Sequence, residues 1–368
     1  MRSAATTVLV LSAACAIAAP LVGLLLAGRA ITPYLIFPPR TEALPHAPFD
    51  WGAFIVLLLP VIGVLALYGS AIARAQPSQR TTLAQRFPWW GWLGLALIAA
   101  GWFLAWNDVV AAGWRRHTFT PLWLGYILTM NAVALRRTGR SPLTHHAVWF
   151  LALFPVSAVL WWLFEYLNQF VDNWYYTGIQ ATSDWDYFIQ ATPPFSSVLP
   201  AVASTWAWLR SFPRLDVMTL PPLRGHPALG WVALVVGALG LAGIGVWPDL
   251  LYAMLWLAPL LVLAGLQQLL LGETLFTSLQ RGDWRPILQP ALAALVCGIF
   301  WEMWNYGSLA KWHYSVPYTQ RFHVFEMPLL GYAGYLPFGV ECALIMDLVA
   351  RIVERRPLWP LDPGQSGA

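Results

Sequence analysis

The chain alternates between long apolar stretches and short polar segments that are rich in arginine. Several apolar stretches exceed 18 residues, and a helix of about that length crosses roughly 30 Å of hydrocarbon. The apolar residues run continuously and do not alternate with polar ones, so they favour helices over strands. Ten membrane spans are predicted, at residues 4–28, 51–73, 88–106, 119–135, 145–168, 193–209, 229–247, 249–271, 288–307 and 328–350. The expected fold class is all-α, a polytopic integral membrane protein with about ten transmembrane helices.

Composition supports a membrane location. Of the 368 residues, 58% are hydrophobic and only 10% are charged, whereas a soluble domain carries about 25% charged residues. The three cysteines, Cys15, Cys297 and Cys342, all fall in apolar stretches. They therefore predict neither a disulfide framework nor a CxxC metal motif. The residues identify no cofactor, and they leave the oligomeric state open.

Basic residues lie almost entirely between the predicted spans, which makes them a guide to topology and not a nucleic-acid-binding surface. Fifteen of the 21 lysines and arginines fall on one predicted side of the membrane and six on the other. The positive-inside rule assigns the more basic side, with both termini, to the cytoplasm. The first apolar stretch is longer than the core of a signal peptide, so we expect an uncleaved helix.

Two parts of the chain carry matching motifs. The matched pairs, 137 or 138 positions apart, are Glu165 with Glu302, Asn168 with Asn305, Trp174 with Trp312, Tyr176 with Tyr314 and Pro200 with Pro337. They predict two four-helix repeats, at 88–210 and 229–350, joined by a cytoplasmic linker at 211–228. Two extra helices in 1–87 precede the repeats, and 351–368 form a cytoplasmic tail. An even number of spans gives both repeats one orientation, and parallel repeats commonly hold a site between them.

Acidic residues inside the predicted spans are the main candidates for chemistry. Glu302 and Asn305 are three residues apart, so they share one helix face. An acid within a span is costly to bury and is a functional candidate by default. The neighbouring amide could donate to the carboxylate or to a ligand; alternatively, the pair only ties its helix to another. Glu341 stands where the first repeat has Ser204, so the more acidic second repeat is expected to hold the working site.

Two aromatic loops, at 169–192 and 308–327, are predicted to lie along the outer membrane interface or to dip into it. Their polar residues do not have the spacing of HExxH or paired ExxH motifs, so no metal site is predicted. The catalytic candidates are Glu302, Glu326, His313, Glu341, Asn305, Glu165 and Asn168. The substrate-binding candidates are Trp301, Trp304, Trp312, Tyr314, Lys311, His323, Trp174 and Tyr176.

The start of the last span is crowded with glycine and proline, and Pro193-Pro194 and Pro200 give the matching span a similar composition. Such helices are expected to be kinked or locally unwound. Glu302, Asn305, His313, Glu326 and Glu341 are predicted to converge on one outer-leaflet pocket. Glu341 lies thirteen residues into its span, so it reaches the others only if that start is bent.

The motif WExxN…KWxY…FEMPLLGxxGxxPFxxEC, between Trp301 and Cys342, resembles a recurrent signature of uncharacterised Trp-rich bacterial membrane proteins. The segment from Pro121 to Leu143 is similar to the same family. The resemblance implies a multi-pass protein of the inner (plasma) membrane of a bacterium, and it carries no assigned activity. In architecture the chain also resembles the bacterial and fungal lycopene cyclases, which are duplicated, helical and acid-using, but it lacks a clear match to their acidic motif.

Two functions from different classes fit these features. The first is a membrane enzyme that does acid/base chemistry on a lipid or isoprenoid, because a buried glutamate can act as a general acid and aromatic faces stabilise cations. The alternative is a proton-coupled transporter or lipid-handling protein that uses the carboxylates as a relay. A scaffold without chemistry would leave the buried acids unexplained. The expected partners are membrane lipid and a lipidic small molecule.

Overall fold

Helices dominate the computed structural model, which describes residues 2–76 and 85–359. Arg80 and the predicted tail beyond residue 359 lie outside the described residues. The longer helices are α1 (Arg2–Leu26), α2 (Trp51–Arg74), α3 (Trp89–Trp106), α5 (Phe119–Thr138), α7 (Ala147–Asn168), α8 (Asp184–Phe195), α9 (Val198–Leu209), α10 (Ala228–Ile244), α12 (Met254–Leu271), α13 (Arg285–Gly307) and α14 (Tyr335–Val353). Shorter ones are α4 (Ala112–Arg115), α6 (Pro142–His145), α11 (Pro248–Leu251) and the 3-10 helices η1 (Thr32–Leu35), η2 (Leu215–Val217), η3 (Leu275–Arg281) and η4 (Leu329–Gly334).

The predicted helical class is confirmed, and the apolar helices are consistent with the predicted membrane location. Within the described part of the chain, six helices are long and apolar enough to cross a membrane, namely α1, α2, α3, α7, α12 and α13. The helix α10 is apolar but shorter. A helix is also present at each of the remaining predicted spans, although the span predicted at 193–209 is divided between α8 and α9.

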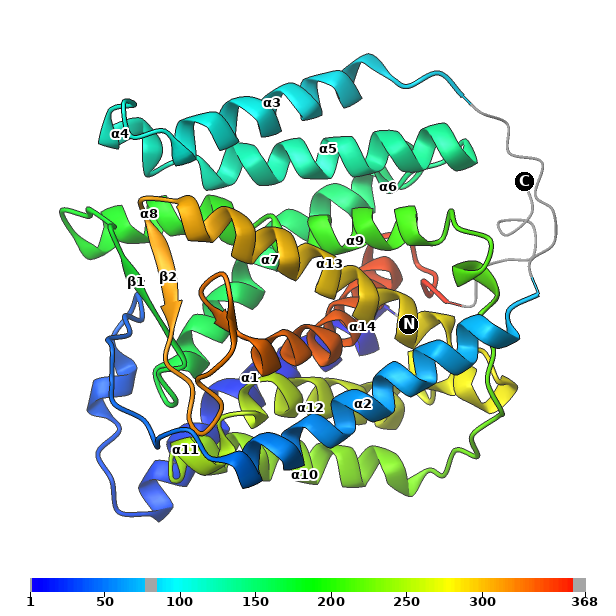
Figure 1. Cartoon of the computed structure of the whole chain (residues 1–368). Helices are drawn as coiled ribbons and strands as arrows, with labels where there is room; N and C mark the ends of the chain where they lie inside the picture. The colour runs from blue at the N-terminus through cyan, green and yellow to red at the C-terminus, as the bar shows by residue number, and fades with distance from the viewer. Residues whose placement is uncertain (1, 77–84, 360–368) are drawn as a thin grey trace.

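The helices run roughly side by side, and the short strands gather at one end of the bundle (Figure 1). The pair α3 and α5 packs on one flank, and the pair α10 and α12 packs on the opposite flank. Between them, α13 contacts α14 and α9, and α7 contacts α9 and α14. The first helix is not peripheral, because α1 packs against α7, α10, α12 and α14. The acidic residues predicted for the site lie on or beside these central helices.

The helix breaks expected from the proline and glycine residues are present in both places. The 3-10 helix η4 precedes α14, and the chain breaks between α8 and α9 at Ser196 and Ser197. A broken helix frees backbone groups that must find other partners in an apolar environment. The buried Ser157 hydroxyl supplies them, because it donates to the Phe195 carbonyl at 2.7 Å and accepts from the Leu199 amide at 3.1 Å. The carbonyl of Phe195 and the amide of Leu199 therefore both have hydrogen-bond partners at the break.

Glycines allow the flanking helix pairs to approach closely. A Cβ atom on Gly125 would lie 2.7 Å from the carbonyl oxygen of Gly94 across the α3–α5 contact. At the α10–α12 contact, a Cβ on Gly265 would lie 2.7 Å from the carbonyl oxygen of Gly230. Small residues at such crossings let backbones pack directly, which is the main source of helix association in lipid.

We expect Gly125→Val to lower the free energy of unfolding by about 1–3 kcal/mol, because the new side chain would force the backbones of α3 and α5 apart. The matched control is Gly63→Val in α2, where nothing lies within 4 Å of the added Cβ. Thermal unfolding in detergent would measure both variants. Equal midpoints for the two would contradict close packing at the α3–α5 crossing.

Two small antiparallel sheets form in the predicted aromatic loops. The strand β1 (Trp174–Thr177) pairs with β2 (Lys311–Tyr314), and β3 (His323–Val324) pairs with β4 (Met327–Pro328). Only β2, with the sequence Lys-Trp-His-Tyr, alternates polar and aromatic residues with the period of two that a strand requires. The strands escaped sequence analysis because each is only two to four residues long, and because the pairing of β1 with β2 joins distant parts of the chain. The β1–β2 sheet positions the candidate site.

Candidate functional site

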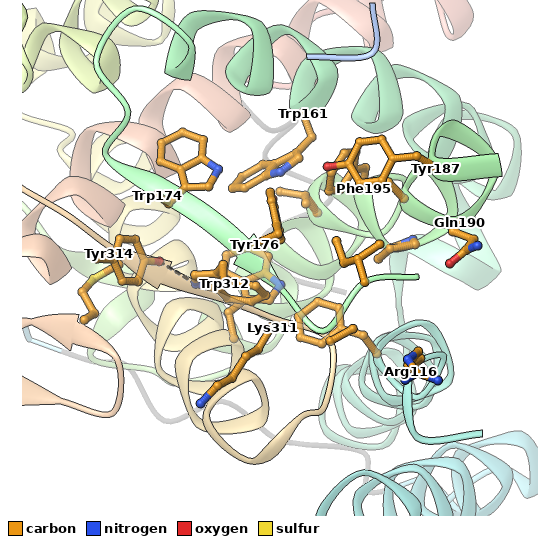
Figure 2. Close-up of a pocket in the computed structure, with 18 of the residues that line it drawn as sticks. Arg116, Trp161, Trp174, Tyr176, Tyr187, Gln190, Phe195, Lys311, Trp312 and Tyr314 are labelled. Atoms are coloured by element: carbon orange, nitrogen blue, oxygen red, sulfur yellow. Dashed lines mark hydrogen bonds between the residues drawn. The ribbon is translucent and has the colours of Figure 1, made fainter. Parts of the chain in front are cut away.

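A cavity of about 150 Å³ lies beside the β1–β2 sheet. Its wall is mainly aromatic, as Figure 2 shows. The aromatic lining residues are Phe119, Trp161, Trp174, Tyr176, Tyr187, Phe195, Trp256, Trp301, Trp312, Tyr314 and Tyr335. A dry apolar cavity of about this volume can hold a benzene-sized group, so it could enclose part of an acyl or isoprenoid chain. The polar lining residues are Arg116, His117, Gln190 and Lys311.

Two asparagines hold the strands in place. The Asn305 side chain donates to the carbonyl of Trp312 at 2.8 Å and accepts from its amide at 2.9 Å. The Asn168 side chain donates to the carbonyl of Trp174 at 2.7 Å and accepts from its amide at 3.4 Å. Both amides therefore bind strand backbone and not the neighbouring carboxylates. Of the two roles considered from the sequence, these contacts match a structural one.

The register of the β1–β2 sheet sorts its side chains onto two faces. Trp174 pairs with Tyr314 and Tyr176 pairs with Trp312, so these four residues share one face. All four line the cavity. The opposite face carries the intervening residues, and there His313 stacks on Tyr175 with ring centroids 5.5 Å apart.

Glu302 lies behind the cavity wall and is fully buried. Its Oε1 atom accepts hydrogen bonds from the hydroxyls of Tyr314 at 2.7 Å and Tyr335 at 2.8 Å. The Tyr314 oxygen in turn accepts from the indole N–H of Trp312 at 2.9 Å. The Oε2 atom of Glu302 has no hydrogen-bond partner among the described residues. Glu302 is therefore linked to the cavity through the hydroxyls of Tyr314 and Tyr335, which both line it.

Glu165 occupies a corresponding position behind the other strand, with 1% of its surface exposed. Its Oε1 atom accepts from the Tyr176 hydroxyl at 2.5 Å and from the indole N–H groups of Trp161 at 3.0 Å and Trp174 at 3.1 Å. Three donors on one oxygen compensate much of the cost of burying a carboxylate. Tyr176 lines the same cavity as Tyr314, so two tyrosine–glutamate pairs face one space.

Burial raises the pKa of the Tyr314 hydroxyl well above its ordinary value, and the nearby Glu302 adds to the effect. Tyr314 therefore stays protonated at neutral pH and does not rest as a phenolate. A protonated phenol between a carboxyl group and a ligand can pass a proton in one concerted step, gaining one proton as it gives up another. The same arrangement holds for Tyr176, whose pKa is also raised by burial and by Glu165.

A second polar cluster lies beside β2, around Glu326. Lys311 Nζ is 2.6 Å from Glu326 Oε1, and His313 Nδ1 is 3.2 Å from Glu326 Oε2. Partial burial raises the pKa of Glu326, but the hydrogen bonds and charges of Lys311 and His313 outweigh that effect and lower the pKa overall. Glu326 is thus held ionised by its neighbours. These contacts hold the β3–β4 turn against β2, and neither Glu326 nor His313 lines the cavity.

None of the five residues predicted to converge on one pocket lines this cavity; they are Glu302, Asn305, His313, Glu326 and Glu341. Six of the eight predicted substrate-binding residues do line it, namely Trp301, Trp312, Tyr314, Lys311, Trp174 and Tyr176. Trp304 instead packs against Trp123, with ring centroids 5.1 Å apart. Glu341 is buried away from the lining, and its Oε2 atom has no hydrogen-bond partner among the described residues. His323 lies in β3, contacts Gln320 at 3.2 Å and does not line the cavity.

Sequence reasoning missed several residues of this site, chiefly Trp161, Tyr335 and Trp256. Trp161 could have been found, because it lies four residues before Glu165 and so shares its helix face. Tyr335 and Trp256 carry no such local signal. Tyr335 reaches Glu302 from 33 positions away in the sequence, and only the packing of α14 on α13 brings the two together.

Within residues 2–76 and 85–359, no group of three or more His, Cys, Asp or Glu side chains is arranged to hold a metal ion. Comparisons with protein-family models, curated proteins and solved structures found nothing that matches this chain. The aromatic cavity and its two tyrosine–glutamate pairs are therefore the features of this structure that bear on function.

Proposed function

We propose that this protein is a membrane-embedded enzyme that performs acid/base chemistry on a lipid or isoprenoid substrate. One observation carries the proposal: Tyr314 and Tyr176 line a single aromatic cavity, and each donates a hydrogen bond to a buried glutamate. The apolar wall suits a hydrocarbon chain. The tyrosines would touch the substrate, and Glu302 and Glu165 would supply and accept the protons behind them.

The two pairs are suited to opposite halves of one reaction. Glu302 accepts two hydrogen bonds, and its Oε2 atom has no hydrogen-bond partner among the described residues, whereas Glu165 accepts three hydrogen bonds. Because hydrogen-bond donors favour the ionised form, we assign Glu302 as the proton donor and Glu165 as the acceptor. A double bond of the substrate takes a proton from Tyr314, which is reprotonated by Glu302. A neighbouring carbon then loses a proton to Tyr176, whose own proton moves to Glu165.

The positive charge formed between these two steps would lie among aromatic faces, which stabilise cations. One proton enters the substrate and one leaves it, so the net change is an isomerisation or a cyclisation. No oxidant and no second substrate are needed. The cavity wall would also keep water from the cation, because water would capture it.

The proposed ten spans and parallel duplication account for the symmetry of this site. In the antiparallel β1–β2 sheet, the two W-x-Y motifs exchange places about a local two-fold axis. The glycine contacts of the flanking pairs support the same relation, since Gly94 and Gly230 are 136 positions apart (230−94) and Gly125 and Gly265 are 140 apart (265−125). With both termini cytoplasmic, the cavity would lie in the outer half of a bacterial plasma membrane.

The transporter alternative is less well supported by the polar residues outside the site. The side chain of Asn131 is buried and donates to Ser204 at 2.7 Å, and that of Gln267 donates to Asp347 at 2.7 Å. Polar side chains that hydrogen-bond to one another in this way hold helices together. They do not form a continuous relay from the cavity to the far end of the bundle.

Native mass spectrometry tests the proposed binding site directly. The protein purified in a mild detergent is expected to retain a lipid, and Ala191→Trp, which fills the cavity from α8, is expected to remove it. The matched control is Ala66→Trp on the exposed surface of α2, which should keep the lipid. Retention of the same lipid by Ala191→Trp would contradict the assignment of the cavity as the substrate site.

A further inference from the structure

One edge of the aromatic cavity carries positive charge. Arg116 comes from the segment between α4 and α5, and its Nε atom donates to the Gly178 carbonyl at 3.1 Å. The preceding residue in β1, Thr177, pairs with Lys311 of β2. Arg116 and Lys311 therefore stand at the same end of the sheet, and both line the cavity.

These basic residues differ in how far their charges are already neutralised. Lys311 is paired with Glu326 at 2.6 Å, and Arg115 is paired with Asp108 at 2.7 Å. Among the ion pairs of the described residues, none includes Arg116. On α8, whose Gln190 also lines the cavity, the carboxylate of Asp186 already accepts hydrogen bonds from Gln190 and Thr182. Arg116 is thus a half-buried cation at the cavity edge that has no protein counter-ion in the described part of the chain.

We propose that the substrate is an amphiphile whose headgroup carries an oxyanion, a phosphate or a carboxylate, bound by Arg116 while its chain lies in the aromatic cavity. This inference rests on the proposed function, because it names the substrate class of the same cavity. A guanidinium presents a planar fork of N–H donors that matches two oxygens of such a group. At the edge of an apolar site the pairing is screened less than in water.

Binding to the purified protein in neutral-lipid nanodiscs would test the headgroup. The probes are farnesyl phosphate, farnesoic acid, farnesol and inorganic phosphate. We expect an anionic chain to bind tighter than farnesol by about tenfold to a hundredfold, as for a charge-assisted hydrogen-bonded pair. The preference should shrink as salt is raised. Whichever of farnesyl phosphate and farnesoic acid binds more tightly identifies the headgroup.

Arg116→Gln is expected to abolish the preference for the anionic chain and to leave farnesol binding unchanged. Arg115→Gln is the matched control. It removes the same charge at the neighbouring position, where the side chain does not line the cavity. Arg116→Lys should keep part of the preference, which separates loss of charge from misfolding. If Arg116→Gln does not fold, the inference is tested instead by the salt dependence of the unaltered protein and by the preference of the Arg116→Lys variant.

Equal binding of farnesol and both anionic chains would overturn this inference and leave the proposed cavity intact. Binding of none of the chains would overturn the proposed function as well. If inorganic phosphate alone binds as tightly as farnesyl phosphate, Arg116 holds a free anion and the amphiphile proposal is wrong.

Discussion

Replacing Glu302 with Gln is expected to slow the reaction by at least about a hundredfold, the usual contribution of a general acid. The variant keeps the side-chain volume and can still accept the Tyr314 hydrogen bond through its amide oxygen, but it has no acidic proton to give. The protein should fold, because neutralising a buried acid relieves the cost of burying charge. Loss of activity with an intact fold is therefore the expected result.

The measurement can be made before the substrate is identified. Isolated membranes that contain the protein are incubated in D₂O, and their lipids are compared by mass spectrometry. A proton delivered to carbon from Tyr314 would appear as deuterium at a position that does not exchange with solvent. Glu302→Gln should lose this label, and Tyr314→Phe should lose it too, because the phenol that contacts the cavity is gone.

Glu341→Gln is the matched control for this experiment. It makes the same change at another buried glutamate, which does not line the cavity. We expect full labelling from this variant. Full labelling by Glu302→Gln, or loss of labelling only in Glu341→Gln, would show that the tyrosine–glutamate pair at Tyr314 is not the proton donor.

Arg351→Met is expected to destabilise the protein by about 3–5 kcal/mol, because it would leave a buried carboxylate without its cation. Arg351 and Asp347 are both buried in α14, with Nε and Oδ2 2.7 Å apart. Arg351 also reaches Glu273 at 2.9 Å, and Asp347 accepts from the Leu358 amide at 2.7 Å. Within the described residues no other cation pairs with Asp347, so its charge would be uncompensated.

Unfolding in detergent, followed by heat or denaturant, would measure this loss. The exposed Arg355 provides the matched control, and Arg355→Met should change stability little. The double variant Asp347→Asn with Arg351→Met should recover much of the loss, since neutralising both partners removes the stranded charge. A single Arg351→Met variant as stable as the unaltered protein would mean that this ion pair does not hold α14 in place.

Local pattern was sufficient to predict the helices, the two buried glutamates and the paired W-x-Y motifs. Continuous apolar stretches determine helices in a membrane, because backbone groups must be satisfied within the segment. Proline and glycine predicted the breaks before α9 and α14. The paired W-x-Y motifs and the glutamates before them could be read from spacing, and Trp174, Tyr176, Trp312 and Tyr314 indeed line one cavity.

The tertiary structure alone decided which side chains face the cavity and which support it. Trp301 and Trp304 both pack against Trp123. Trp301 also stacks on Tyr335 and lines the cavity, whereas Trp304 does not line it. The hydrogen bond of Tyr335 to Glu302 joins separate elements and has no signature in either one alone.

Sequence alone determined that acids, aromatic residues and helix breaks recur at matching places along the chain. It could not determine that the tyrosines bonded to the two glutamates line one cavity, because that depends on how β1 pairs with β2. Their register joins residues 140 positions apart, such as Trp174 and Tyr314 (314−174), and it exists only once the helices between them have packed. Local pattern sets what each segment can form, and long-range packing sets which of its side chains meet.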